Sequence, residues 1–227
     1  MIERRRIYLV RHGAVSYFAD DGSPLDPRNV PLTAEGRAQA AALAEALTGA
    51  PVDRAVCSGM PRARETAELA LAGRGLDIGD EPRFREIKAG RLRDVPAERL
   101  EAELAYPYDH AGTPGARFTG GEAWSDFAAR VMAGWADLMA DGGWHDLFIC
   151  AHDAVNRVIL AEVAGLGLGA AAALEQDLCC LNILDVGPER AFIRTLNVTP
   201  YDLPKTGLRA TSMEKVYSTY TARHSGV

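Results

Sequence analysis

Short apolar runs alternate with amphipathic stretches along most of the chain. The runs 7–10, 52–57 and 147–151 are short and rich in apolar residues, which is typical of strands buried in a parallel sheet. Between and after them, helical spacing or helix-start signals occur at 33–47, from Pro61 onward, at 121–140 and at 154–164. A closing strand pair, 178–186 and 191–198, surrounds the turn Gly187-Pro188. The alternation of strands and helices predicts an α/β fold.

The remaining segments lack this regularity. Residues 14–31 read as an ordered loop that shapes a pocket, and 76–86 looks extended. Residues 91–121 combine a short polar helix, about 96–105, with aromatic residues and arginines. This composition favours a lid or pocket wall, or else packing under a long loop. The candidate wall residues are Tyr106, Tyr108, Arg117 and Phe118. The polar tail 199–227 has no core pattern of its own. It folds back over the body, covers a partner subunit or is loosely held.

Composition narrows the class of protein. With 227 residues, 48% of them hydrophobic, the chain suits a single domain over 1–227 with a cap-like insertion at 91–121. A net charge of −6 and a pI near 5.4 leave no broad basic field for nucleic acid or an anionic membrane. The first apolar run is too short for a signal peptide or a membrane span, so we expect a cytoplasmic protein.

Cysteines and scattered histidines give no metal signature. The cysteines lie in apolar runs, as buried free thiols do, and lack chelate spacing: Cys57, Cys150, Cys179 and Cys180. His110, His145 and His224 are isolated from one another, and we expect surface or loop positions for them.

Polar residues follow the predicted strands at the point where each strand ends. Arg11-His12-Gly13 ends the first, Ser58 follows the second and His152-Asp153 follows the third. Ligands of open α/β sheets bind beyond the carboxyl ends of the strands, so these side chains would converge on one site if the strands are parallel neighbours. Gly13 lets the backbone turn and lets a ligand approach closely.

Arg62 occupies the first turn of the helix that starts at Pro61. A cation there is opposed by the helix dipole unless an anion lies between them, which makes Arg62 a candidate oxyanion ligand. The alternative is an exposed arginine that pairs with Glu65.

These motifs together resemble the histidine phosphatase superfamily, also called the phosphoglycerate mutase-like family. The resemblance extends to about Val198. It rests on Arg11-His12-Gly13, Leu32-Thr33-x-x-Gly36, Ser58, Arg62-Ala63, Thr66-Ala67, Glu86 four residues before Gly90, Gly120-Gly121-Glu122 and His152 after a late strand. It implies a three-layer α/β/α sandwich with a mostly parallel central sheet.

The resemblance also implies roles for individual residues. His12 is the nucleophile that becomes phosphohistidine, Glu86 is the proton donor, and Arg11, Arg62 and His152 bind the phosphoryl oxygens. Chemistry supports these roles, because histidine attacks only when neutral and neighbouring cations disfavour its protonated form. Two arginines and a protonated histidine can neutralise the phosphoryl group, so we expect no metal and no cofactor.

Several positions depart from the family pattern. Members often carry polar residues where this chain has Ala14, Val15 and Phe18, which indicates an apolar wall and a substrate with an apolar or aromatic portion. A Glu-Gly pair is common where Arg93-Asp94 stands here. Glycine is usual at Asp153, which we expect to turn away and cap the following helix, or else to bind a cationic or hydroxyl group of the substrate.

The sequence therefore favours a phosphatase of the family acting on a small phosphorylated substrate. A cofactor-dependent phosphoglycerate mutase is the first alternative, although the mutases carry a longer basic insertion where this chain has 91–121. A non-catalytic phosphate-binding module is the second, and retention of the nucleophile argues against it. An edge strand or the tail makes a homodimer possible.

Overall fold

A six-stranded mixed sheet forms the centre of the computed structural model, which describes residues 4–19, 23, 25–207 and 209–224. Its strand order is β3-β2-β4-β1-β5-β6. The strands are β1 (Arg5–Arg11), β2 (Arg54–Cys57), β3 (Ile78–Asp80), β4 (Asp146–Ala151), β5 (Leu181–Val186) and β6 (Ala191–Val198). The parallel pairs are β1 with β4, β4 with β2 and β2 with β3, whereas β5 is antiparallel to both β1 and β6. The predicted strand pair at the end of the chain is confirmed.

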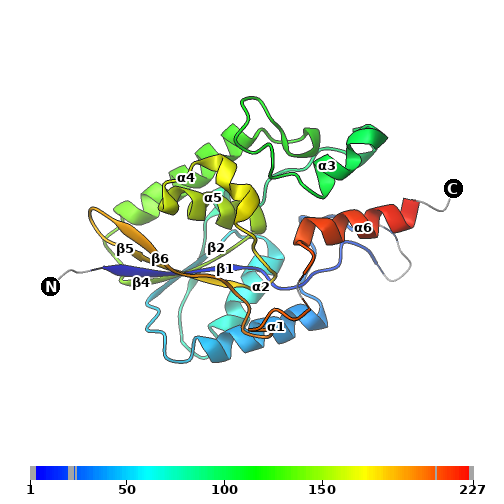
Figure 1. Cartoon of the computed structure of the whole chain (residues 1–227). Coiled ribbons are helices and arrows are strands. Elements are labelled where there is room, and N and C mark those ends of the chain that lie inside the picture. The colour runs from blue at the N-terminus through cyan, green and yellow to red at the C-terminus, as the bar shows by residue number, and fades with distance from the viewer. Residues whose placement is uncertain (1–3, 20–22, 24, 208, 225–227) are drawn as a thin grey trace.

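Helices cover both faces of the sheet (Figure 1). α1 (Ala34–Ala46) and α2 (Pro61–Ala70) lie on one face, with α4 (Trp124–Ala140) and α5 (Asp153–Ala164) on the other. Side chains of β1 alternate between two cores, because successive residues of a strand point to opposite faces. Tyr8 and Val10 join one core, and Ile7 and Leu9 join the other. The predicted three-layer α/β/α architecture is therefore confirmed.

Parallel pairing brings the ends of three strands to one edge of the sheet. Val10 of β1 pairs with Cys150 of β4, which pairs with Cys57 of β2. The residues that follow these strands therefore lie at neighbouring positions, as the sequence predicted for parallel neighbours.

The sequence predicts an extended segment over 76–86, but only part of it is extended. β3 ends at Asp80, and Pro82–Phe84 forms a turn of 3-10 helix. Pro82 has no amide hydrogen for a sheet ladder, and the Glu81 side chain accepts a hydrogen bond from the Arg83 amide at 3.0 Å, which starts the turn.

The predicted helix over 121–140 starts later, at Trp124. Its first residues are used for another contact, because the Glu122 amide donates to the Lys88 carbonyl at 2.8 Å. Phe127, Val131 and Leu138 are buried, which confirms the aromatic and aliphatic face of this helix as core.

The tail contains a helix that the sequence analysis missed, α6 (Ser212–His224), and it folds back over the body. α6 lies beside the cap-like segment, whose main helix is α3 (Leu100–Leu104), and Tyr106 Oη donates to Glu214 Oε1 at 3.2 Å between them (Figure 1). Thr211 and Glu214 form a capping box: the Thr211 amide donates to Glu214 Oε2 at 2.6 Å and the Glu214 amide to Thr211 Oγ1 at 3.1 Å.

Some predictions fall outside what the structure tests. Residues 20–22 and 24 of the predicted loop, and 208 and 225–227 of the tail, lie outside the described residues. The single-domain organisation stays a prediction. Within the described ranges, no helix is long and apolar enough to cross a bilayer. The four cysteines are buried free thiols, as predicted.

Candidate active site

The predicted catalytic residues meet at the carboxyl edge of the sheet. Arg11 ends β1 and His12 follows it, Arg62 stands in the first turn of α2, and His152 follows β4. Arg62 Nε lies 3.1 Å from His12 Nε2, and the rings of His12 and His152 are 5.1 Å apart. Glu86 approaches from the segment after β3. The structure thus brings together five residues from four separate segments of the sequence.

His12 is held in the protonation state that a nucleophile needs. Its Nδ1 lies 2.8 Å from the Gly13 carbonyl oxygen, which can only accept, so Nδ1 carries the hydrogen. Nε2 accepts from Arg62 and therefore presents its lone pair to the site. Burial first, and then the charges of Arg62 and Arg11, lower the pKa of His12 well below its usual range.

Close backbone packing fixes the loop that carries His12. A Cβ on Gly13 would lie 2.7 Å from the Gly36 carbonyl oxygen, and one on Gly36 would lie 2.2 Å from the Ala14 carbonyl oxygen. Thr66 Oγ1 accepts from the Gly13 amide at 3.0 Å. The Leu-Thr-x-x-Gly motif and Thr66 therefore position the loop that carries His12.

The two arginines are buried in the site. Arg62 donates through Nη1 to the Pro27 carbonyl at 2.7 Å, whereas Glu65 pairs with Arg37 at 2.6 Å. The alternative of an exposed Arg62 paired with Glu65 is therefore wrong. Arg11 Nη1 donates to Ser212 Oγ at 2.6 Å and to the Gln176 carbonyl, while its Nε has no hydrogen-bond partner among the described residues.

His152 is fully buried at the N-cap position of α5. Its Nε2 lies 2.7 Å from Ser58 Oγ, and its Nδ1 has no hydrogen-bond partner in the described part of the chain. The sequence predicts a protonated histidine at this position. Burial, followed by the charge of Arg62, instead lowers the pKa of His152 well below its usual range, so the imidazole is neutral until an anion offsets those cations.

Glu86 is a partly buried residue whose carboxyl accepts two backbone amides. Oε1 accepts from Ile87 at 2.9 Å and Oε2 from Ala154 at 3.4 Å. Burial first, and then the charge of Asp153, raise the pKa of Glu86 above its ordinary value, although Arg11 and Arg62 oppose the shift. A raised pKa is what a proton donor at neutral pH requires.

Asp153 does not cap α5, contrary to our expectation. His152 holds the N-cap position and Asp153 is the first helical residue. Its Oδ1 accepts from Arg157 Nε at 2.6 Å, and its Oδ2 lies 3.7 Å from Arg11 Nη1. The Asp153 carboxylate binds the buried guanidinium of Arg157 instead of backbone amides of α5, because a carboxylate buried away from water needs a positive charge beside it.

Among the proposed pocket-wall residues, Phe118 and Tyr108 are buried against Trp124, with ring centroids 5.7 and 5.5 Å away. Tyr106 and Arg117 are exposed. Phe18 is partly buried in the loop after β1, and its contact with substrate stays a prediction.

Sequence reasoning missed residues that support the site from a distance. Arg130 donates to the carbonyls of Arg83, Arg85 and Glu86 and pairs with Glu122 at 2.8 Å, which holds the segment carrying Glu86. No local pattern marks Arg130. Ser212 could have been found through the capping box Thr211-x-x-Glu214, a sequence-level signal for a helix start.

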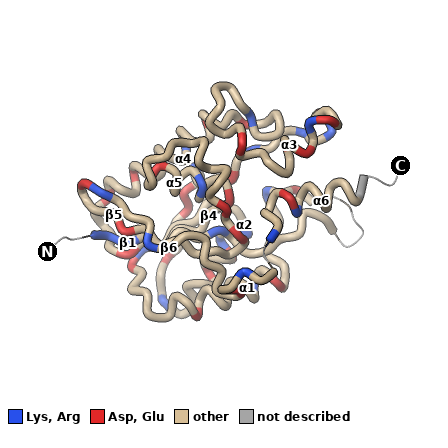
Figure 2. Tube along the Cα trace, viewed as in Figure 1, with Lys and Arg blue, Asp and Glu red and all other residues tan. Residues whose placement is uncertain are grey.

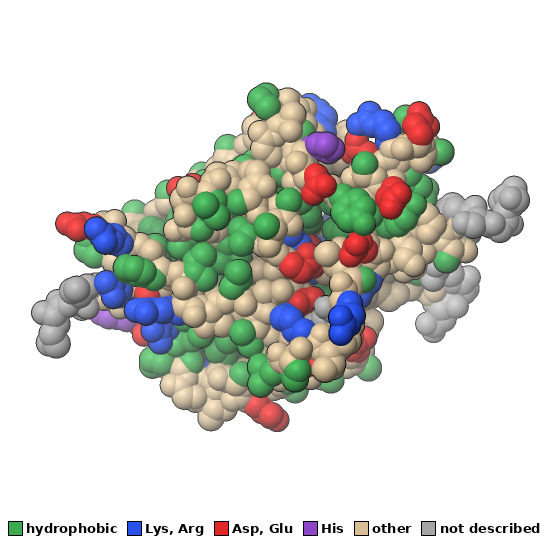
Figure 3. Space-filling model, in the orientation of Figure 1, with side chains coloured by type: hydrophobic (Ala, Val, Ile, Leu, Met, Phe, Trp, Pro, Cys, Tyr) green, Lys and Arg blue, Asp and Glu red, His purple; other side chains and the backbone are tan. Residues whose placement is uncertain are grey.

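Charges of both signs are interspersed along the described part of the trace (Figure 2). On the face seen in Figure 3, acidic side chains gather on the side where α3 and α6 lie. Within the described residues, no group of three or more His, Cys, Asp or Glu side chains could hold a metal ion. Independence from metal and from nucleic acid stays a prediction.

Comparison with known proteins agrees with this geometry. Residues 7–199 match the model of the histidine phosphatase superfamily (branch 1). The chain is 30% identical over 199 residues to the adenosylcobalamin/alpha-ribazole phosphatase of Escherichia coli (strain K12), which covers 85% of this chain and 95% of that protein. It is 28% identical over 182 residues to a protein of Enterobacter sp. (strain 638) named probable phosphoglycerate mutase GpmB, covering 79% of this chain and 84% of that protein.

A solved structure is similar in fold. The mycobacterial glucosyl-3-phosphoglycerate phosphatase in complex with VO3 superposes with a TM-score of 0.69 at 25% identity, over 85% of this chain and 98% of that one. These similarities support a hydrolase of the phosphatase type. Because the matched family model runs from within β1 to the end of β6 and includes the site described above, the chain belongs to branch 1 of the histidine phosphatase superfamily.

Proposed function

We propose that this protein is a metal-independent phosphatase that hydrolyses a small phosphomonoester through a phosphohistidine on His12. The observation that carries the proposal is the state of His12: buried, neutral, with Nδ1 fixed on the Gly13 carbonyl and Nε2 directed toward the Arg62 guanidinium. A phosphoryl group bound by that guanidinium lies in front of the lone pair that attacks it.

In the first step, His12 Nε2 attacks phosphorus as the bond from phosphorus to the leaving oxygen breaks. Arg62 turns its donors from the imidazole to the phosphoryl oxygens, and Arg11 and His152 donate to the same group. Glu86 gives its proton to the leaving oxygen, so the alcohol departs neutral.

In the second step, water attacks the phosphohistidine. The Glu86 carboxylate takes a proton from that water, the bond between phosphorus and Nε2 breaks, and the electron pair returns to His12. The guanidinium groups neutralise the charge on the phosphoryl oxygens, which is the main demand of phosphoryl transfer.

Mutase activity is the second candidate, and similarity to the protein named GpmB favours it. The same residues can return the phosphoryl group to a bound phosphoglycerate instead of to water. The names of the relatives also suggest a first substrate panel: alpha-ribazole phosphate, glucosyl-3-phosphoglycerate and phosphoglycerates.

The test is release of inorganic phosphate from this panel in the presence of a chelator, for the unaltered protein and for His12→Ala. Rapid acid-free quenching with radiolabelled substrate should trap a phosphoenzyme on His12. His110→Ala is the matched control, because His110 is an exposed histidine outside the site.

We expect hydrolysis that resists chelator and is lost only in His12→Ala. Conversion of one phosphoglycerate to another without phosphate release would favour the mutase. Neither reaction, despite saturable phosphate binding, would leave a non-catalytic binding module.

A further inference from the structure

Two carboxyl groups flank the amino end of α5. Glu86 Oε2 accepts from the Ala154 amide at 3.4 Å, and the residue before Ala154 is Asp153, which is buried. Both carboxyls face Arg11 at the end of β1. Two carboxyl groups in one poorly hydrated site resist ionising together, so their surroundings decide which one keeps a proton.

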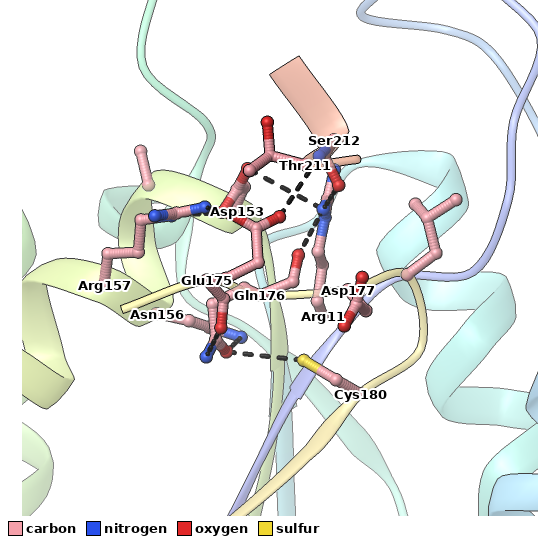
Figure 4. A network of polar contacts seen from close by, with 12 residues as sticks. Arg11, Asp153, Asn156, Arg157, Glu175, Gln176, Asp177, Cys180, Thr211 and Ser212 are labelled. Atoms are coloured by element: carbon pink, nitrogen blue, oxygen red, sulfur yellow. Dashed lines mark hydrogen bonds and ion pairs between the residues drawn. The ribbon is translucent and has the colours of Figure 1, made fainter. Parts of the chain in front are cut away.

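The surroundings of Asp153 favour its charge. Oδ1 accepts from Arg157 Nε at 2.6 Å, and Oδ2 lies 3.7 Å from Arg11 Nη1 (Figure 4). Arg157 is itself fixed in place, because it donates to the Ala171 carbonyl at 2.8 Å, contacts Glu175 and stacks 4.0 Å from the centre of the Tyr108 ring. Asp153 is therefore buried between two guanidinium groups that can compensate a negative charge there.

The surroundings of Glu86 favour its neutral form. No ion pair to Glu86 occurs within the described ranges, and its hydrogen bonds come only from backbone amides. The charged groups facing it are Arg11 from β1, Arg62 from α2 and Asp153 from α5, and the Tyr108 hydroxyl faces it from the cap-like segment. Arg130 from α4 also approaches Glu86, because it donates to the Glu86 carbonyl at 3.2 Å. Burial and Asp153 outweigh the arginines, so the pKa of Glu86 is raised.

We propose that Asp153 is a positioning residue for the proton donor, forming with Glu86 an unequal pair in which Asp153 keeps the charge and Glu86 keeps the proton. The inference rests on the proposed function, in which Glu86 protonates the leaving oxygen. The proposal explains why an acidic residue follows His152. The Asp153 carboxylate binds Arg157 and raises the proton affinity of Glu86.

The test uses the dependence of phosphoryl transfer on pH and on the leaving group. Single-turnover rates are measured for phenyl phosphate, whose leaving group needs a proton, and for p-nitrophenyl phosphate, whose leaving group departs without one. Asp153→Asn is compared with the unaltered protein and with Glu86→Gln. Asp185→Asn is the matched control, because Asp185 is also buried and paired with two arginines, Arg6 and Arg194, but it lies on β5 beside Arg6, at the opposite end of β1 from Arg11.

Removing the charge of Asp153 lowers the pKa of Glu86, so Glu86 loses its proton at a lower pH. With phenyl phosphate we expect the alkaline limb of Asp153→Asn to move down by about one pH unit and the neutral rate to fall roughly tenfold. The rate with p-nitrophenyl phosphate should change little, and Asp185→Asn should leave both profiles in place. Equal losses for both substrates with an unmoved limb would overturn the proposal.

Infrared spectroscopy supplies a second measurement that needs neither turnover nor Asp153→Asn. The difference between the unaltered protein and Glu86→Gln should contain a protonated carboxyl band at neutral pH. Absence of that band overturns the unequal pair even if hydrolysis occurs. A band without any His12-dependent hydrolysis would retain the pair and remove the proposed function instead.

Discussion

Arg62 contacts two groups that a bound phosphoryl group would replace, the imidazole of His12 and the carbonyl of Pro27. A guanidinium presents its donors in a fixed fork that matches two phosphoryl oxygens, whereas the ammonium of lysine does not. We expect Arg62→Lys to lower kcat/KM by roughly a hundredfold to a thousandfold, the usual loss for a donor to transition-state charge. Steady-state kinetics with p-nitrophenyl phosphate measures it.

Arg64→Lys is the control for this prediction. Arg64 lies on the same helix but is partly exposed and pairs with Asp80 at 2.5 Å, outside the site. The kcat/KM of Arg64→Lys should equal that of the unaltered protein. Similar losses in both variants would mean that the substitutions act through the stability of α2.

The strand-end residues were predictable because parallel strands deliver their carboxyl ends to one edge, so Arg11, His12 and His152 needed only the correct strand assignment. The partners of Asp153 were not predictable. Its pairing with Arg157 follows helical spacing, but the sequence alone gives no reason for that arginine to be buried, which depends on Ala171 and Tyr108 from other segments.

At the scale of elements, the segment carrying Glu86 has little regular structure and is held by Arg130 of α4. Arg130 donates to the carbonyls of Arg83 at 2.6 Å, Arg85 at 2.7 Å and Glu86 at 3.2 Å. Arg130→Gln leaves these acceptors without charged donors, and we expect a loss of about 1–3 kcal/mol in the free energy of unfolding. The rate with phenyl phosphate should fall more than the rate with p-nitrophenyl phosphate, because Glu86, the proposed proton donor, moves.

Urea denaturation and single-turnover kinetics check this prediction together. Arg99→Gln is the control, since Arg99 is an exposed residue just before α3 that pairs with Glu103, and it should change stability by less than about 0.5 kcal/mol. An Arg130→Gln protein with normal stability and normal leaving-group discrimination would contradict the assignment.

The C-terminal helix α6 is held by its first turn. Thr211 and Glu214 cap it, and Ser212 connects it to the site, donating from its amide to Glu175 Oε1 at 3.1 Å and accepting from Arg11. Replacing an N-cap threonine by alanine costs about 1 kcal/mol, so amides of α6 in Thr211→Ala should exchange roughly fivefold faster.

Hydrogen–deuterium exchange measures the effect, with Ser218→Ala as an exposed control on the same helix. Unchanged exchange in Thr211→Ala would mean that the capping box does not hold α6. The position of α6 could not be read from the sequence, because its side chains show no clear apolar face and its main attachments are polar contacts with Arg11 and Glu175.

At the scale of the whole molecule, the site lies at the strand ends, with the cap-like segment and α6 on the same side of the fold (Figure 1). His12 and His152 are both buried there, and burial followed by the charge of Arg62 lowers the pKa of each well below its usual range. In the unfolded chain each histidine takes up a proton at about pH 6.5. Below that pH the unfolded state binds more protons, so stability falls as pH falls.

Each buried histidine should contribute a slope of about 1.4 kcal/mol per pH unit below about pH 6.5, down to its lowered pKa in the folded state. Glu86 acts in the opposite direction, because its raised pKa favours proton uptake by the folded state.

Comparison with a variant that lacks His12 isolates the contribution of this histidine. We expect the stability of His12→Asn relative to the unaltered protein to be constant above about pH 7.5 and to rise by that slope below about pH 6.5, in urea unfolding without phosphate. For His110→Asn, at an exposed site, the curve of unfolding free energy against pH should run parallel to that of the unaltered protein. Parallel curves for His12→Asn as well would mean that His12 titrates equally in both states, and the neutral nucleophile on which the mechanism depends would be lost.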